Sequence, residues 1–260
     1  MTKKKVLVTG IVPKEGLQKL MAQCEVTYSE DTPFSREYVL EHLKDYDAWL
    51  LMGQKGDREM IDAAQNLQLI SLNAVGYDHV DIAYAKEKGI TVSNSPQAVR
   101  VPTAEMTITL MMAAAKRLAF YDKVVRQGEW LDPSERRFQG MTLQGATLGI
   151  YGMGRIGFTV AEFAKALGMK VVYNDLYRLP QEREEELGVH FLDFDQLISQ
   201  ADVVSIHAPY LPSTHHQFNK DVFRAMKNRS YLVNAARGPI VSEEDLVWAL
   251  TVSYTHLRAH

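Results

Sequence analysis

The 260-residue chain has an ordinary globular composition, in which 46% of the residues are hydrophobic and 23% are charged, so a mainly disordered protein is excluded. Acidic residues outnumber basic ones by 32 to 29, and the net charge of −3 argues against a nucleic-acid-binding protein. The single cysteine, Cys24, excludes an intramolecular disulfide, and no apolar run approaches the roughly 20 residues of a membrane span. A cytoplasmic protein without a membrane partner is expected.

The first hundred residues alternate short apolar runs with helical stretches. The apolar runs predict strands at 6–10, 26–28, 48–52, 69–72 and 90–92, and the stretches between them predict helices at 15–23, 38–43, 60–64 and 82–88. Continuous apolar strands separated by helices are typical of a parallel sheet that is covered on both faces. We therefore predict the α/β class for this part of the chain.

A long helix is expected next, beginning at Thr103 and ending at Gln127. Its middle, residues 106–115, is so apolar that burial on several sides is expected, as in a helix between domains or subunits. A second alternating series follows, with strands predicted at 147–151, 170–174, 190–191, 203–206 and 231–234. The charged helix predicted at 181–187 carries four acidic residues that are expected to form a solvated face, namely Glu182, Glu184, Glu185 and Glu186.

A glycine-rich turn is the strongest chemical signal in the sequence. Gly152, Gly154 and Gly157 form Gly-x-Gly-x-x-Gly directly after a predicted strand and at the start of a predicted helix. The first glycine permits a tight turn, the second lets the backbone approach a pyrophosphate, and the third allows close packing of helix on strand. A turn that serves packing alone is the alternative interpretation, but the strand and helix on either side favour dinucleotide binding.

An acidic residue supports the dinucleotide interpretation. Asp175 ends the strand that follows the glycine-rich turn, where a carboxylate accepts hydrogen bonds from the adenosine ribose and repels a 2′-phosphate. This position predicts NAD rather than NADP as cofactor. Arg178 lies three residues further on, where its positive charge would weaken that preference.

Three histidines and one arginine follow later strands of the second series. His207 is either a proton donor or a residue that orders the cofactor-side loop, whereas His215 and His216 are interpreted as surface residues because neighbours in sequence point apart and a third metal ligand is not evident. Arg237 comes after the fifth strand, where a guanidinium is suited to grip a carboxylate or polarise a carbonyl. A salt bridge from Arg237 to Glu243, Glu244 or Asp245 is the equally weighted alternative.

Four blocks of residues together resemble one enzyme family. They are Gly76 to Asp81, Asn94-Ser95-Pro96 through Ala104-Glu105, the glycine-rich turn with Asp175, and Met226-Lys227 through Asn234 to Gly238. Over nearly its whole length the chain resembles the D-isomer-specific 2-hydroxyacid dehydrogenases, which include glyoxylate reductases and D-lactate dehydrogenases. The resemblance implies an NAD-dependent interconversion of a small 2-oxo acid and its D-2-hydroxy acid.

The resemblance also implies a domain division and a set of site residues. Residues 1–99 would form a flavodoxin-like substrate domain and residues 100–251 a Rossmann NAD-binding domain, with the helix from Thr103 to Gln127 in a homodimer interface. Val75 and Gly76 match the substrate-carboxylate cradle, Arg237 matches the catalytic arginine that anchors the substrate, and Lys55 is placed beside the substrate, a solvated lysine being the alternative. The implied cofactor-binding residues are Thr103, Gly152, Gly154, Arg155, Ile156, Gly157, Asp175, His207, Ala208, Pro209, Thr214, Ala235, Ala236 and Arg237.

The end of the chain departs from the family. The family's catalytic glutamate and histidine lie downstream of the arginine, whereas only 23 residues follow Arg237, and His256 and His260 lack the expected Thr-Pro-His context. Residues 252–260 read as a translated sequencing adapter, a non-native tail. We therefore expect an incomplete NAD-binding domain in which residues 231–234 form an exposed edge strand, and a chain that is marginally stable and catalytically inactive.

Two other functions were weighed against the dehydrogenase. An NAD(H)-sensing regulatory protein of the corepressor type would carry the same motifs on the same fold. A methyltransferase with a glycine-rich loop would not explain the segment from Asn234 to Gly238 after the fifth strand.

Overall fold

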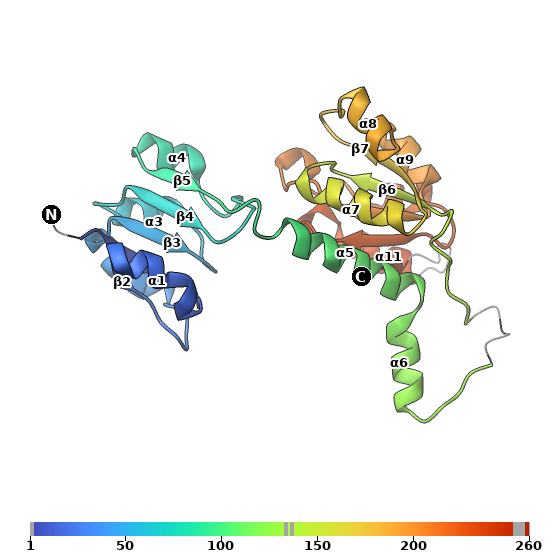
Figure 1. Cartoon of the computed structure of the whole chain (residues 1–260), viewed down its shortest axis with the longest axis horizontal. Helices are drawn as coiled ribbons and strands as arrows, with labels where there is room; N and C mark the ends of the chain where they lie inside the picture. Colours follow the sequence, from blue (N-terminus) through green and yellow to red (C-terminus); the bar gives the residue numbers. More distant parts are fainter. Residues whose placement is uncertain (1–2, 133–134, 136–137, 252–257, 260) are drawn as a thin grey trace. The chain divides into compact units, whose positions relative to one another are not determined.

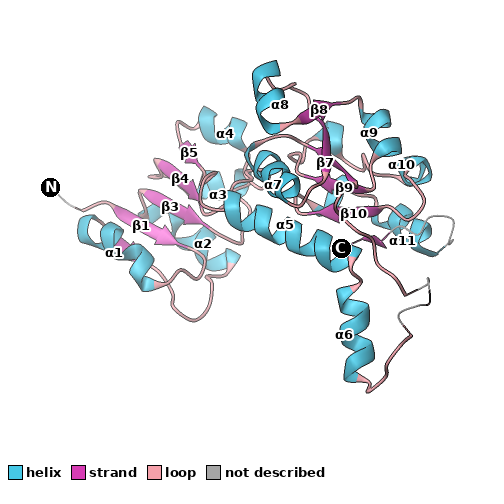
Figure 2. Ribbon diagram, turned by 45° about the vertical axis from the view of Figure 1, so that its right-hand side comes forward, coloured by secondary structure: helices cyan, strands magenta, loops and turns pink. Residues whose placement is uncertain are grey.

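The computed structural model describes residues 3–132, 135, 138–251 and 258–259. The chain divides into two compact units, residues 1–99 and 100–260, and each is described by itself. Figures 1 and 2 label the helices and strands of both units. In the part of the chain that is described, we find no helix with both the length and the apolar character needed to cross a membrane.

The first unit is a five-stranded parallel sheet with the order β2-β1-β3-β4-β5. Its strands are β1 (Lys5–Val8), β2 (Glu25–Thr27), β3 (Ala48–Leu51), β4 (Leu69–Leu72) and β5 (Thr91–Ser93). Its helices are α1 (Lys14–Gln23), α2 (Arg36–His42), α3 (Arg58–Ala63) and α4 (Ile82–Glu87), with a 3₁₀ turn, η1, at Leu43–Asp45. The predicted order of strands and helices is thus confirmed, with element ends shifted by one or two residues.

Alternation along the strands explains why this sheet is covered on both faces. Successive side chains of a strand point to opposite faces, so Leu7 of β1 packs with Trp49 of β3 in one apolar cluster. Val6 and Val8 belong to a second cluster with Leu17 of α1. All of these side chains are buried, which accounts for apolar strand runs that have no polar face.

The second unit is a six-stranded parallel sheet with the order β11-β10-β9-β6-β7-β8. Its strands are β6 (Thr147–Tyr151), β7 (Lys170–Asn174), β8 (Val189–Phe191), β9 (Val203–Ile206), β10 (Tyr231–Asn234) and β11 (Arg258–Ala259). Its helices are α5 (Arg100–Ala115), α6 (Leu118–Arg126), α7 (Arg155–Ala166), α8 (Gln181–Leu187), α9 (Phe194–Gln200), α10 (Lys220–Ala225) and α11 (Glu243–Thr251), with 3₁₀ turns η2 (Pro212–Thr214) and η3 (Gly238–Ile240). This strand order is that of the doubly wound dinucleotide-binding fold.

The prediction of a single long helix from Thr103 to Gln127 is wrong. The structure has two helices, and Arg117 between them adopts a left-handed conformation with φ of 58°. The cause is non-local: the Ala115 carbonyl accepts a hydrogen bond from the Met141 N–H at 2.8 Å. Gly140 permits this approach, because a Cβ there would lie 2.4 Å from the same carbonyl oxygen.

Burial on several sides is expected for the apolar part of this region, and within one copy of the chain only part of its apolar surface is buried. Met111 and Ala114 of α5 are buried against α7 and the sheet, but Met106 remains 55% exposed. On α6, Leu118 is 61% exposed. The two helices therefore bury one apolar side and present another.

The prediction that β10 forms an exposed edge of the sheet is also wrong. Residues 258 and 259 add a short parallel strand beside it, with Tyr231 opposite Arg258 and Leu232 opposite Ala259. Tyr231, Leu232 and Val233 are all buried, packed between the two apolar clusters of the unit. Residues 252–257 and 260 of the tail, which is expected to be non-native, lie outside the described residues.

Candidate functional site

The glycine-rich turn lies at the point where the strand order of the second unit reverses. Ligands of open parallel sheets bind in the crevice at such a point, here between β6 and β9. Gly152 follows β6 with φ of +100°, and a Cβ on it would lie 2.4 Å from the Ala208 nitrogen. The turn is held by backbone hydrogen bonds from Gly152 N–H to the Asn174 carbonyl (2.8 Å) and from His207 N–H to the Tyr151 carbonyl (2.7 Å). Glycine is thus required both by the backbone conformation and by the neighbouring loop.

The other two glycines of the turn have different surroundings. A Cβ at Gly157 would lie 2.2 Å from the Gly152 carbonyl oxygen, so helix and turn are in direct backbone contact. Apart from its immediate chain neighbours, no heavy atom of the described residues lies within 4 Å of the Cβ position of Gly154. Gly154 is the N-cap of α7, whose first residue, Arg155, is exposed, and Ile156 after it is half-buried. An open approach to the N-terminus of a 12-residue helix fits a pyrophosphate.

Asp175 is fixed beside this turn by its own hydrogen bonds. Its Oδ2 accepts from the Met153 N–H at 2.6 Å, and its Oδ1 accepts from the Tyr177 N–H at 3.1 Å. The carboxylate is therefore oriented at the end of β7 and next to Gly154. In dinucleotide-binding folds a carboxylate near this position accepts hydrogen bonds from the ribose.

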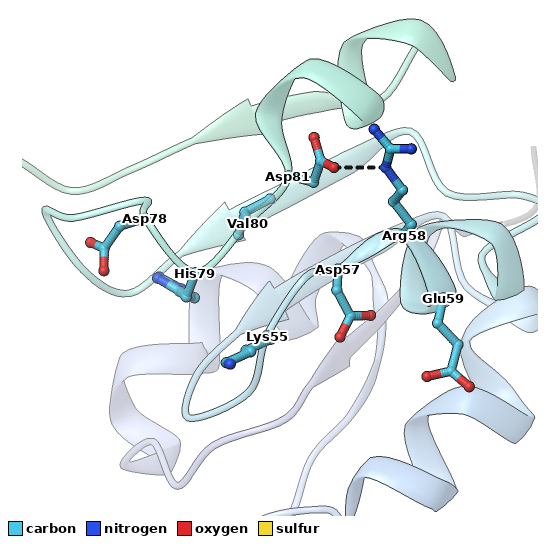
Figure 3. Close-up of a pocket in the computed structure, with 8 residues that line it drawn as sticks. All are labelled: Lys55, Asp57, Arg58, Glu59, Asp78, His79, Val80 and Asp81. Atoms are coloured by element: carbon cyan, nitrogen blue, oxygen red, sulfur yellow. Dashed lines mark hydrogen bonds and ion pairs between the residues drawn. The ribbon is translucent and has the colours of Figure 1, made fainter. Parts of the chain in front are cut away.

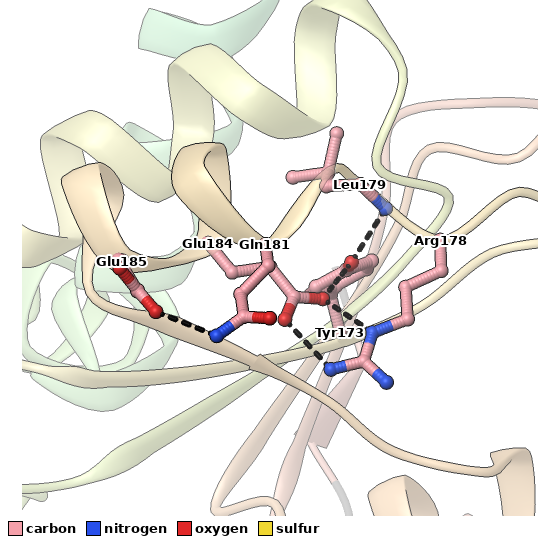
Figure 4. Close-up of polar contacts among 6 residues, drawn as sticks. All are labelled: Tyr173, Arg178, Leu179, Gln181, Glu184 and Glu185. Atoms are coloured by element: carbon pink, nitrogen blue, oxygen red, sulfur yellow. Dashed lines mark hydrogen bonds and ion pairs between the residues drawn. The ribbon is translucent and has the colours of Figure 1, made fainter.

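Arg178 is engaged with a buried carboxylate, which corrects one expectation (Figure 4). Glu184 was expected on a solvated face, but only 6% of it is exposed. Its Oε1 and Oε2 accept from Nε and Nη2 of Arg178 at 2.9 and 2.8 Å, and Tyr173 donates its hydroxyl to Oε1 at 2.5 Å. These charged and polar donors compensate the cost of burial, whereas Glu182, Glu185 and Glu186 on the same helix are exposed as predicted.

His207 lies at the end of β9 and is paired with Ser205. The Ser205 hydroxyl and the His207 Nε2 are 2.8 Å apart. Desolvation by the surrounding protein lowers the pKa of His207 to about 4, so the ring is neutral at neutral pH. A neutral ring with a side-chain partner favours the cofactor-side interpretation over that of a proton donor.

The loop that follows His207 is shaped by Thr214. Its buried hydroxyl accepts from the Leu211 N–H at 2.8 Å and lies 3.0 Å from the Pro209 carbonyl. Ala208 in this loop is buried and Pro209 is exposed. His215 and His216 are exposed, as predicted for surface residues. The expectation that their side chains point apart is wrong: the two rings stack with their centroids 3.8 Å apart, and His216 has a left-handed backbone conformation with φ of 50°. In the described part of the chain, no group of three or more potential metal ligands was found.

Arg237 follows β10, at the same edge of the sheet as the glycine-rich turn and the end of β9. Asn234 shapes this loop, because its Nδ2 donates to the Arg237 carbonyl (2.8 Å) and its Oδ1 accepts from the Ala236 N–H (3.0 Å). Arg237 is half-buried, and its Nη1 donates to the Ala236 carbonyl at 2.9 Å. Ala235 and Ala236 are half-buried between the asparagine and the arginine.

Two further residues that were predicted to bind substrate, Val75 and Gly76, lie in the first unit after β4. The Val75 carbonyl accepts from Nδ2 of Asn94 at 2.7 Å, and the Ser95 N–H donates to the Ala74 carbonyl at 3.0 Å. Asn94 and Ser95 therefore hold the segment that contains Val75 and Gly76. Thr103, which was predicted to bind the cofactor, lies in α5 of the second unit and is half-buried.

Lys55 lines a charged pocket of about 560 Å³ in the first unit. Figure 3 shows Lys55 and Asp57 on one side of this pocket and Asp78 and His79 on the other. The two segments are joined by a hydrogen bond from the Gly56 N–H to the His79 carbonyl at 2.9 Å. Lys55 is exposed, in keeping with the alternative of a solvated lysine.

Three residues position segments of the candidate site, although the sequence did not predict this role for them. Asn234, Asn94 and Glu184 each fix a segment that was singled out for chemistry. For Asn234 a signal existed, because asparagine side chains often bond to the backbone two residues further on. Glu184 gave no such signal, since its pattern is that of a solvated helix face.

Comparison with known proteins identifies relatives of the whole chain. Residues 108–255 match the family model "D-isomer specific 2-hydroxyacid dehydrogenase, NAD binding domain". A glyoxylate reductase of Thermofilum pendens is 40% identical over 254 residues, which are 96% of this chain and 75% of the relative. The crystal structure of a glyoxylate reductase from Paecilomyes thermophila has a TM-score of 0.86 at 32% identity and covers all of this chain and 82% of that one. A D-lactate dehydrogenase from Aquifex aeolicus, complexed with NAD and lactic acid, has a TM-score of 0.83 at 28% identity, over 98% of this chain and 76% of that one.

Proposed function

Since this chain belongs to the D-isomer specific 2-hydroxyacid dehydrogenase family, whose members are NAD-dependent oxidoreductases, we propose that it interconverts a small 2-oxo acid and the matching D-2-hydroxy acid. The observation that carries the proposal is the position of Arg237 at the sheet edge that also holds the glycine-rich turn and Asp175. An arginine there is placed to bind an anionic substrate next to the cofactor.

Each residue of the proposed site has a defined task. Arg237 holds the substrate carboxylate and polarises the adjacent carbonyl, which stabilises negative charge developing on the carbonyl oxygen. Asn234 keeps the arginine loop in shape through its two backbone hydrogen bonds. Val75 and Gly76 are the residues that we assign to the carboxylate cradle, in the segment that Asn94 and Ser95 hold by hydrogen bonds. NADH, when bound, supplies the hydride.

The test measures binding rather than turnover, because substrate binding is the role proposed for Arg237. NADH is titrated by its fluorescence, and glyoxylate and oxamate, an analogue of small 2-oxo acids, are then titrated into the NADH complex. We expect NADH to bind and both acids to bind to the complex. Arg237→Gln should weaken acid binding at least about tenfold, since a charge-assisted pair is lost.

Arg224→Gln is the matched control, because it makes the same change at an exposed arginine of α10 that pairs with Asp221. It should leave the binding of both acids unchanged. NADH binding without any response to 2-oxo acids would refute the proposal and would point instead to an NAD(H)-sensing protein.

We also propose that α5 and α6 form a homodimer interface. The supporting observation is a set of exposed apolar side chains on these helices, namely Val101, Met106, Met112, Leu118 and Val125. Exposed apolar side chains on two consecutive helices are a feature that a subunit interface would cover. Sedimentation analysis should show a dimer that Met106→Lys weakens, whereas Ile11→Lys, at a similarly exposed apolar residue of the first unit, should not; a monomeric chain would contradict the proposal.

A further inference from the structure

Arg178 lies three residues after the ribose-binding Asp175, in the place where an arginine could accommodate the 2′-phosphate of NADP. Its guanidinium is instead turned to Glu184. We propose that Glu184 and Tyr173 form a latch that holds Arg178 away from the ribose, and that this latch and Asp175 together set the preference for NAD over NADP. The inference deepens the proposed function and rests on NAD binding by this unit.

Both carboxylate oxygens of Glu184 accept hydrogen bonds in the latch. Oε1 of Glu184 accepts from both Tyr173 Oη and Arg178 Nε, and Oε2 accepts from Arg178 Nη2. The Leu179 N–H donates to Tyr173 Oη at 2.8 Å, which orients the hydroxyl proton toward Glu184 (Figure 4). Removing Arg178 from this arrangement would leave a buried carboxylate with a single side-chain partner, so the bound position is favoured.

The two ends of the ion pair differ in exposure, and this difference is what makes the latch releasable. Side-chain exposure is 8% for Glu184 but 62% for Arg178. The Glu184 carboxylate is therefore confined by the surrounding protein. The Arg178 guanidinium reaches solvent, so it is able to adopt another rotamer once its partner is removed. Loss of the charge on Glu184 should accordingly release Arg178 without rebuilding the strand.

The latch is expected to hold at every physiological pH. Hydrogen bonds from Arg178 and Tyr173 lower the pKa of Glu184 to about 2, so it is ionised. Burial and the neighbouring carboxylate raise the pKa of Tyr173 to about 12, so it remains a donor. The ion pair between Glu184 and Arg178 is therefore expected to persist over the physiological pH range, and it does not act as a pH-dependent switch.

Two effects then act against NADP. The Asp175 carboxylate repels a 2′-phosphate, and Arg178 is unable to neutralise that phosphate unless it first leaves Glu184. Substitution of Asp175 alone removes the repulsion but leaves the arginine latched. A full change of preference should therefore require both residues to be altered.

The experiment compares dissociation constants for NADH and NADPH, measured by fluorescence, in Asp175→Asn, Glu184→Gln and the double variant. Relative to Asp175→Asn, the double variant should bind NADPH at least about tenfold more tightly, with NADH affinity changed less than twofold. Adding Arg178→Ala to the double variant should cancel the gain. Glu182→Gln is the matched control, because it removes the same charge from an exposed position of α8 and should not change the ratio.

Three outcomes would overturn the inference. They are a gain in NADPH affinity that survives Arg178→Ala, a gain that Glu182→Gln matches, and no gain at all in the double variant. If Glu184→Gln does not fold, the NADPH affinity of Arg178→Ala tests the latch instead. An affinity within twofold of that of the unaltered chain supports a latched arginine, and a tenfold loss refutes it. An unaltered chain that binds neither nucleotide would refute the proposed function as well, whereas NADH binding with an unchanged ratio would refute only the latch.

Discussion

Gly157→Ala should destabilise the second unit, although the same substitution in a helix ordinarily stabilises a protein. Gly157 is the third residue of α7, and a Cβ there would lie 2.2 Å from the Gly152 carbonyl oxygen and 3.2 Å from Ile150 Cγ2. Helix propensity favours alanine by roughly 1 kcal/mol. Overpacking costs about 1–3 kcal/mol, and the upper end applies because the opposing atom is backbone. We expect a net loss of about 2 kcal/mol of unfolding free energy.

Gly16→Ala is the matched control in the first unit. Gly16 is likewise the third residue of its helix, α1, but a Cβ there would meet only Val12 Cγ1 at 3.5 Å, an ordinary contact. Alanine at this position should stabilise the first unit by about 0.5–1 kcal/mol. The two substitutions are therefore expected to have opposite signs.

Hydrogen exchange measured by mass spectrometry separates the two units, because each amide reports on the opening of its own region. Exchange should accelerate in β6 and α7 of Gly157→Ala and slow in α1 of Gly16→Ala. NADH affinity should also fall at least about tenfold in Gly157→Ala, since the turn must move to admit the methyl group. Equal or slower exchange around α7 would refute the argument from backbone contact.

Three further predictions concern the same unit. Gly154→Ala should weaken NADH binding about tenfold while changing the free energy of unfolding by less than about 1 kcal/mol, because its Cβ position is open; a large loss of stability in urea would contradict this. His207 has a folded-state pKa of about 4, below the ordinary 6.5, so the unfolded chain binds its proton first and stability falls as the pH drops from about 6.5 to 4. Urea unfolding at pH 7, 5.5 and 4.5 should show a smaller fall in His207→Asn, and an equal fall would refute the assignment. Asn234→Ala should cost about 1–2 kcal/mol and weaken glyoxylate binding to the NADH complex, which parallel unfolding and binding titrations would check.

Some features of this protein depend only on residues that are neighbours along the chain, and these were predictable. Apolar runs such as residues 48–51 predicted strands that the structure confirms, because burial on both faces leaves a continuous apolar segment. The glycine-rich turn and Asp175 were recognisable because their spacing follows from one strand, one turn and one helix. These features together indicated the fold class and the cofactor.

Other features depend on residues that are distant in sequence, and they became visible only in the folded structure. The helix break at Arg117 follows from a hydrogen bond between Ala115 and Met141, which no local pattern records. Glu184 reads as solvated from its helix, yet it is buried because Tyr173 from a strand and Arg178 from a loop satisfy its charge. Local periodicity predicts which side chains of an element are buried. It does not predict which distant residue pairs with a buried charge or carbonyl, because that residue is brought close only when the chain folds.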